Sequence, residues 1–222
     1  MSELNIVYID DDLVVVDKPR GMLVHPVREP HPREEIAMKV IRDQLGQKVY
    51  TVHRLDRPTS GLLLFALNVP AVRVMQELFE FRKVAKKYIA VVHGKTPEVW
   101  ECDQALHKVE NDEMKDALTK FRRLSYRPAG SFDGDPTLEV SVVEAIPHTG
   151  RFHQIRRHLA ENGFPIVGDY LYGGIDQNNE VAEKTGISRM MLMSTELAFV
   201  HPINGNNIKI NAEPSEEFTF FM

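Results

Sequence analysis

One short run of residues carries most of the chemistry that the sequence could perform. Residues 53–61 place a single carboxylate, that of Asp56, among two arginines, a histidine and two hydroxyl groups. Arginines within about 4–6 Å of a carboxyl group favour its ionised form, so Asp56 could act as a nucleophile near neutral pH. The alternative is a surface turn whose Asp–Arg pair contributes little to stability.

A second group of polar residues lies at the start of an amphipathic helix, which the spacing of apolar residues predicts over residues 152–162. Arg156 comes four residues after Phe152 and so borders the apolar face, whereas Arg157 points more outward. A partly buried arginine requires an anionic partner, and we expect that partner to be Asp56. The alternative is a helix whose arginines are solvated or bind their own chain.

A tyrosine stands among lysines in a third segment, where residues 87–93 are predicted to form a strand. Lys86 and Lys87 directly precede Tyr88. An exposed aromatic ring beside lysines is suited to stacking on a base while the lysines neutralise phosphates. The alternative is that Tyr88 belongs to the apolar core of the strand.

Other kinds of site find little support. His148, His153 and His158 repeat every five residues, which turns each about 140° from the last on an ideal helix, so they cannot share one metal ion. The single cysteine cannot form a thiolate metal site or an internal disulfide. Phosphate-binding glycine loops are absent, and Ser60 lacks the setting of a serine hydrolase nucleophile. We therefore expect neither a metal nor a cofactor.

The composition is that of an ordinary globular protein. The 222 residues are 43% hydrophobic and 27% charged, and the formal net charge is −5. No apolar run approaches the roughly 20 residues of a membrane helix, and the N-terminus does not resemble a signal peptide, so we expect a cytoplasmic location. Because the chain as a whole is acidic, any positively charged surface that binds nucleic acid must be confined to one part of the protein. Nothing indicates a subunit interface, which favours a monomer.

The elements that must position these residues follow from periodicity and turn signals. We expect helices over residues 34–45, from Asn68 onward and over residues 152–162, and strands over residues 4–16 (a hairpin), 61–66, 87–93, 119–124 and 138–146. Asn204 and Gly205 indicate a further hairpin turn. Residues 109–116 and 174–188 are expected to form exposed loops or edge helices, and the acidic tail, residues 213–217, to be solvated.

Taken in order, these segments resemble the RluA-type family of pseudouridine synthases. The family signature is similar to residues 53–61, its N-terminal motif to residues 17–26, its tyrosine motif to residues 86–92 and its arginine motif to residues 149–159, with residues 168–173 as a further match. Four ordered motifs are far more specific than one. Arg57 with Pro58 and the basic run after Gln154 are most similar to the branch that modifies uridine 65 of transfer RNA.

The resemblance implies an α+β pseudouridine synthase fold. Its long, mixed and mostly antiparallel sheet would form two lobes with flanking helices and a central active-site cleft. We expect residues 1–222 to be a single catalytic domain without a separate N-terminal RNA-binding module. The expected partner is an RNA substrate, with no membrane, metal or small-molecule cofactor.

The same resemblance implies residue roles. Asp56 would be the nucleophile, at the sugar or at the base, while the C1'–N1 bond of uridine breaks and C5 joins C1'. Tyr88 would stack on the base and help to remove the C5 proton, and Arg156 would hold Asp56 ionised. Arg54 would fill the gap left by the flipped uridine. The remaining residues expected to bind substrate are His53, Arg57, Thr59, Lys86, Arg151, His153 and Gln154.

Alternatives remain at this stage. The substrate could be ribosomal RNA, the chain could be a non-catalytic RNA-binding protein, or Asp56 could serve a small-molecule hydrolase. One position departs from the family pattern, because Met193 stands where a histidine is usual. It lies outside the catalytic motifs, so it affects expectations about packing near the substrate rather than about the chemistry.

Overall fold

The computed structural model describes residues 3–26, 35–107, 113–132 and 138–222. The chain divides into two compact units, Met1–Lys86 with Ser194–Ala212, and Lys87–Met193 with Glu213–Met222. Within the described ranges, no helix combines the length and the apolar character needed to span a bilayer. The expected single catalytic domain, and the cleft expected between two lobes, stay predictions.

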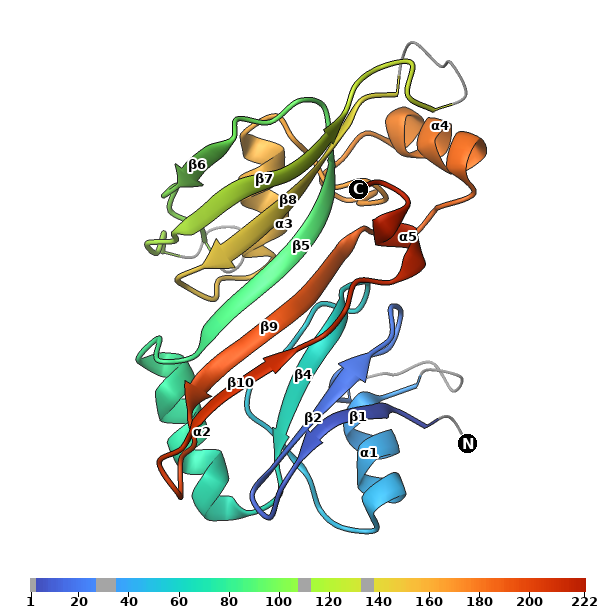
Figure 1. The fold of residues 1–222 in the computed structure, drawn as a ribbon. Helices are drawn as coiled ribbons and strands as arrows, with labels where there is room; N and C mark the ends of the chain where they lie inside the picture. Colours follow the sequence, from blue (N-terminus) through green and yellow to red (C-terminus); the bar gives the residue numbers. More distant parts are fainter. Residues whose placement is uncertain (1–2, 27–34, 108–112, 133–137) are drawn as a thin grey trace. The chain divides into compact units, whose positions relative to one another are not determined.

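The first unit is a sheet with two helices (Figure 1), in which β1–β2, β2–β4, β3–β4 and β9–β10 are antiparallel pairs. Its elements are β1 (Asn5–Ile9), β2 (Leu13–Lys18), α1 (Ala37–Leu45), β3 (Tyr50–Thr51), β4 (Ser60–Ala66), α2 (Val69–Glu80), β9 (Leu192–Val200, from Ser194 onward) and β10 (Asn207–Asn211). The strand order is β1-β2-β4-β9-β10, and β3 pairs with the end of β4. The helices α1 and α2 and both hairpins confirm the predicted elements, with α1 ending at a left-handed Gly46.

The core of this unit explains why β4 lies at its centre. All seven residues of β4 are buried, as the continuous apolar run predicts. Leu62, Leu64 and Ala66 pack in one cluster with residues of β2, with Leu197 of β9 and with Met75 of α2. Helix α2 begins where the side chain of Asn68 accepts a hydrogen bond from the N–H of Ala71 at 2.9 Å. The strand that follows the Asp56 loop is therefore held in place by packing on its neighbours.

The strands of the second unit pair antiparallel in the order β5-β8-β7-β6, and three helices accompany them. Its elements are β5 (Ala85–His93, from Lys87 onward), β6 (Val99–Cys102), β7 (Thr119–Arg127), β8 (Val140–Pro147), α3 (Gln154–Glu161), α4 (Ile175–Thr185) and α5 (Glu216–Thr219). The mixture of helices with a large, mostly antiparallel sheet confirms the expected fold class.

Three details differ from expectation. Helix α3 begins at Gln154 rather than at Phe152, because His153 adopts a left-handed conformation with φ 52°. Residues 174–188 are expected to form an exposed loop or an edge helix, and helix α4 occupies most of them. The tail is exposed at Glu213 and Glu216, as predicted, but it leads into the fully buried Phe218. Part of the predicted loop over residues 109–116 lies outside the described residues.

Gly61 makes a testable contribution to the first unit. Its φ of +100° is unfavourable for residues with a side chain, and a Cβ atom there would lie 2.1 Å from the backbone oxygen of Ser194. We expect Gly61→Ala to lower the free energy of unfolding by about 3 kcal/mol or more, measured by urea denaturation. Gly46→Ala is the control, since its Cβ would meet nothing within 4 Å, and it should cost about 1–2 kcal/mol. Equal losses for both variants would contradict the proposed close packing.

Candidate active site

The Asp56 loop connects β3 to β4 in the first unit. Within it the chain turns back on itself, because the N–H of Thr59 donates to the carbonyl oxygen of Asp56 at 3.0 Å. The side chain of Asp56 is half-buried, and that of Arg54 is exposed. The loop therefore presents a carboxylate and a guanidinium group two residues apart, directly before a buried strand.

A buried lysine holds this loop in place through hydrogen bonds to backbone carbonyl oxygens. Lys18 is fully buried, and its Nζ donates to the carbonyl oxygens of Pro19 at 2.8 Å, Met22 at 3.0 Å and Arg57 at 3.2 Å. The N–H of Gly21 donates to the same Arg57 oxygen at 2.8 Å, and Nε of Arg57 donates to the oxygen of Gly21 at 3.0 Å. Because an ammonium group is stable in the interior only with such acceptors, the lysine and the loop depend on each other. Lys18 lies in the N-terminal motif over residues 17–26, but nothing in the local sequence predicts this role.

His53 is held by the protein itself. Its Nε2 accepts a hydrogen bond from the N–H of Leu64 at 2.9 Å, and its ring stacks on Phe79 with centroids 4.7 Å apart. Burial, together with the positive charge of Lys86, lowers the pKa of His53 to about 3. Burial also lowers the pKa of Lys86. His53 is thus neutral at physiological pH, and its predicted contact with substrate stays a prediction.

Thr59 shows an unusual buried hydroxyl group. The residue is 2% exposed, and its Oγ1 finds no hydrogen-bond partner among the residues that the structure describes. Unsatisfied buried hydroxyl groups are uncommon in folded proteins. The residue is one of those predicted to bind substrate, and that role stays a prediction.

The second unit brings Tyr88 and helix α3 to the same face of its sheet. Tyr88 is opposite Ala145, which is opposite Phe121, so these three side chains share a face. Thr119 lies on that face as well, two residues from Phe121, and its hydroxyl oxygen accepts a hydrogen bond from Nε2 of Gln154 in α3 at 2.9 Å. The helix that carries Arg156 therefore covers the face to which Tyr88 belongs.

Arg156 forms a buried, two-pronged ion pair. Its Nε donates to Oδ2 of Asp169 at 2.7 Å and its Nη2 to Oδ1 at 2.8 Å, with both side chains almost completely buried. The inward direction of Arg156 confirms the helical-spacing argument. Asp169 is an anionic partner that sequence analysis did not predict. The predicted pair with Asp56 joins residues of different units and stays a prediction.

Hydrogen bonds from several elements fix the position of Asp169. Its Oδ1 also accepts from the N–H of Leu171 at 3.1 Å. The side chain of Asn178, buried in α4, accepts from the N–H of Gly168 at 2.8 Å and donates to the carbonyl oxygen of Asp169 at 3.2 Å. His93 of β5 completes the arrangement, with its Nε2 3.0 Å from Oδ1 of Asn178. Backbone, helix and strand together determine where the guanidinium group of Arg156 lies.

Three other predicted residues of this unit are engaged within the protein. Gln154 is buried and uses its whole amide, accepting from Thr149 and from the N–H of Arg151 and donating to Leu118 and Thr119. Nε of Arg151 donates to the carbonyl oxygen of Asp116 at 3.0 Å. Nδ1 of His153 lies 3.0 Å from the hydroxyl oxygen of Tyr172. For Gln154 in particular, a contact with substrate would require these internal bonds to break, so that role stays a prediction.

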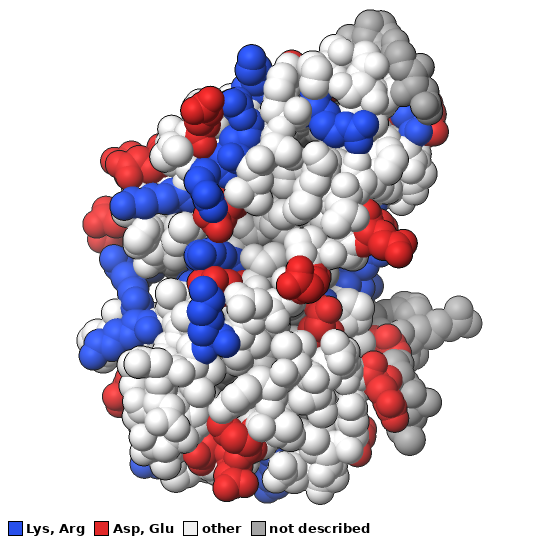
Figure 2. Space-filling view, in the orientation of Figure 1, with Lys and Arg blue, Asp and Glu red and all other residues white. Residues whose placement is uncertain are grey.

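Basic side chains on the other face of this sheet do not belong with Tyr88. Successive residues of a strand point to opposite faces, so Lys87 lies on the face opposite Tyr88. There its Nζ lies 3.9 Å from Glu144, which Arg122 also contacts at 3.1 Å. Figure 2 shows lysine and arginine side chains interleaved with acidic ones on the side that carries β7. Much of this basic surface is therefore partly neutralised.

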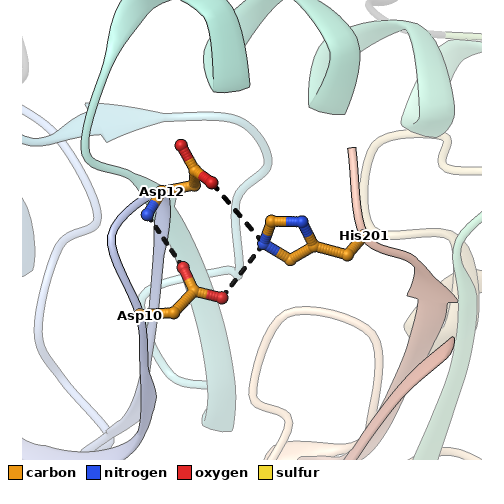
Figure 3. Close-up of side chains that lie close together, drawn as sticks. All are labelled: Asp10, Asp12 and His201. Atoms are coloured by element: carbon orange, nitrogen blue, oxygen red, sulfur yellow. Dashed lines mark hydrogen bonds and ion pairs between the residues drawn. The ribbon is translucent and has the colours of Figure 1, made fainter. Parts of the chain in front are cut away.

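Asp10, Asp12 and His201 of the first unit offer three metal-ligand atoms within 4.8 Å of one another. Figure 3 shows the imidazole facing both carboxylates, with Nε2 3.0 Å from Oδ2 of Asp10 and 4.0 Å from Oδ2 of Asp12. However, Nδ1 faces the backbone N–H groups of Ile203 and Asn204 at 3.3 and 3.2 Å, so it acts as the acceptor and the proton is on Nε2. A ligand histidine needs the reverse arrangement. The cluster is best described as an electrostatic tie between two hairpin turns.

Sequence comparisons with known proteins give consistent results. Residues 12–161 match the family model described as RNA pseudouridylate synthase. A Haemophilus ducreyi protein named tRNA pseudouridine synthase C is 42% identical over 221 residues, which is 95% of this chain and 90% of that protein. The Haemophilus influenzae protein of the same name is 40% identical, with 99% and 96% covered.

Solved structures give the same result for the fold. The human RNA Pseudouridylate Synthase Domain Containing 1 protein superposes with a TM-score of 0.78 at 25% identity, covering 96% of this chain and 84% of that one. The human Domain Containing 4 protein gives a TM-score of 0.74 at 23% identity, covering 97% and 90%. The second similarity concerns the fold alone.

The buried ion pair makes a stability prediction. Replacing Asp169 by Asn keeps the shape of the side chain but removes the charge that faces the guanidinium group of Arg156. We expect the free energy of unfolding to fall by about 3–5 kcal/mol in urea denaturation. Asp176→Asn, an exposed position in the first turn of α4, is the control and should change it by less than about 1 kcal/mol. A loss at position 169 no larger than at position 176 would show that the pair does not stabilise the fold.

The cluster of Asp10, Asp12 and His201 makes a prediction about metals. If it is an electrostatic tie, the melting temperature should be the same in EDTA as in millimolar Mg²⁺ or Mn²⁺, to within about 1 °C. His201→Phe should lower the melting temperature in both conditions alike, because it removes the contact between the two turns. A metal-dependent increase of several degrees that disappears in His201→Phe would instead establish a cation site.

Proposed function

Because the chain belongs to the RNA pseudouridylate synthase family, we propose that it converts uridine 65 of transfer RNA to pseudouridine. The enzyme is an isomerase that acts on RNA. The proposal of a transfer RNA substrate is carried by one observation, namely that relatives 40–42% identical over nearly the whole chain are named tRNA pseudouridine synthase C. Position 65 rests on the resemblance of the signature and arginine motifs to that branch of the family.

The proposed reaction exchanges one bond for another. The C1'–N1 bond breaks, the base turns, C5 bonds to C1', the proton of C5 is lost and N1 gains a proton. Reactant and product have the same composition and oxidation state, so no oxidant or reductant is needed. What the protein must supply is a nucleophile, a means of proton transfer and a fixed position for the detached base.

We assign these tasks to residues of both units. Asp56 would be the nucleophile, and the tether from Lys18 to the carbonyl oxygen of Arg57 supports this role by limiting where the carboxylate can move. Tyr88 would stack on the base and assist removal of the C5 proton. Arg156 would favour the ionised form of Asp56, and its pair with Asp169 supports this role by fixing the guanidinium plane.

Two further elements of the proposal are simpler. Arg54, exposed two residues before Asp56, would occupy the gap in the stack left by the extruded uridine. We also propose that a single copy of the chain suffices for activity and that it acts in the cytoplasm.

The nucleophile assignment predicts a specific loss. Asp56→Asn should lower the rate of pseudouridine formation in transfer RNA more than about 1000-fold, because the amide is not nucleophilic, while RNA affinity changes little. Carbodiimide-dependent primer-extension stops on purified transfer RNA would measure the product. Asp43→Asn, an exposed residue of α1 paired with Arg42, is the control and should keep the wild-type rate. Residual turnover near wild type in Asp56→Asn would rule out Asp56 as the nucleophile.

The substrate assignment is tested separately. Transfer RNA from cells that lack the gene should carry uridine at position 65, and the purified enzyme should restore pseudouridine there. If the lost pseudouridine lies in ribosomal RNA instead, the substrate proposal is wrong although the reaction is unchanged. If wild-type enzyme forms no pseudouridine in any RNA, the catalytic proposal fails as well, and a binding protein or a hydrolase becomes the better description.

A further inference from the structure

An exposed aromatic residue stands at the entrance to helix α3. Phe152 precedes the helix by two residues, and 45% of it is exposed. Its ring stacks on that of His153, with centroids 3.7 Å apart and an interplanar angle of 22°. One face of Phe152 is thus covered by the protein, while a large part of the residue remains accessible to a ligand.

The backbone at His153, whose ring forms this stack, is strained. Its φ of 52° is in the left-handed region, which Arg82 alone shares among the described residues other than glycine. Such conformations are unfavourable by about 1–3 kcal/mol and tend to be retained at functional sites. Here the strain directs the imidazole so that Nδ1 lies 3.0 Å from the hydroxyl oxygen of Tyr172. The rings of His153 and Tyr172 meet edge to face, with centroids 5.7 Å apart.

This row of rings leads to the buried ion pair. The guanidinium carbon of Arg156 lies 5.0 Å from the centroid of the Tyr172 ring. The backbone N–H of Tyr172 donates to Oδ1 of Asp169 at 3.3 Å. Phe152 is therefore the outermost member of a rigid series that ends at the arginine assigned to the reaction.

We propose that Phe152 is a stacking platform for an unpaired base of the RNA substrate, at a subsite next to the target uridine. The proposal rests on the proposed function, since it takes RNA as the ligand. Unpaired bases bind proteins by stacking on aromatic side chains, and nearby arginines neutralise the phosphates. Arg151 directly precedes Phe152 and Arg157 follows it by five residues; each donates a hydrogen bond to a backbone carbonyl oxygen, which leaves its positive charge in place.

Tryptophan fluorescence tests the stack directly. The chain has one tryptophan, Trp100, which stacks on Phe121 and contributes the same background to every variant. In Phe152→Trp, transfer RNA and oligouridylate should quench the added emission, because a base would stack on the new indole. An oligomer of abasic ribose phosphates should not. Phe220→Trp, at a residue 46% exposed, is the matched control and should respond to none of the three.

Catalysis provides a second readout. Phe152→Leu keeps an apolar side chain but loses the flat ring, so we expect kcat/KM on transfer RNA to fall about tenfold or more, mostly through KM. Phe152→Trp should restore it, and Phe220→Leu should leave it unchanged.

The results separate this inference from the proposed function. Absence of base-specific quenching in Phe152→Trp, or a normal KM in Phe152→Leu, in a protein that still forms pseudouridine would overturn the stacking site alone. Quenching of equal size at positions 152 and 220 would overturn it too, by showing non-specific RNA contact. Absence of pseudouridine formation by wild-type enzyme would overturn the proposed function instead.

Discussion

The buried pair between Arg156 and Asp169 is the interaction on which the second unit depends. An isolated charge in the interior is very unfavourable, so each member requires the other and requires hydrogen bonds for its remaining polar atoms. Two parallel hydrogen bonds join the guanidinium group to the carboxylate, while backbone N–H groups and the side chain of Asn178 hold the turn that carries the carboxylate. The pair fixes helix α3 to that turn, and with it the direction in which the arginine can act.

The spacing of apolar residues and the capping residues predicted much of the architecture, because helices and strands are determined largely by interactions between residues close in sequence. The continuous apolar run of β4, the Asn68 cap of α2 and the inward direction of Arg156 each follow from residues within one or two turns of chain. The hydrogen-bond partners of Arg156 and Lys18 were harder to predict. Asp169 lies 13 residues from Arg156, and the carbonyl oxygen of Arg57 lies 39 residues from Lys18, so their meeting depends on how strands and turns fold back. The left-handed conformation of His153 has only a weak signal in residue type, because histidine adopts it more often than most residues but still rarely.

The acidic net charge is compatible with an RNA substrate once the charges are placed. On the β7 side of the second unit, Lys87 and Arg122 share the carboxylate of Glu144, which cancels part of their positive charge. The face that α3 covers is different in kind, because it combines Tyr88 with arginines and the aromatic series that begins at Phe152. Recognition there would depend on stacking and on a few well-oriented cations rather than on total charge.

The central claim is that Asp169 serves the reaction by orienting Arg156, and a double-mutant cycle tests it most directly. Conversion of uridine to pseudouridine releases the hydrogen of C5, so single-turnover tritium release from transfer RNA labelled at C5 of uridine measures the chemical step. The account predicts that Asp169→Asn slows release strongly in the wild-type background but adds little in Arg156→Lys, where the two-pronged geometry is already lost. Independent losses that multiply in the double variant would contradict it.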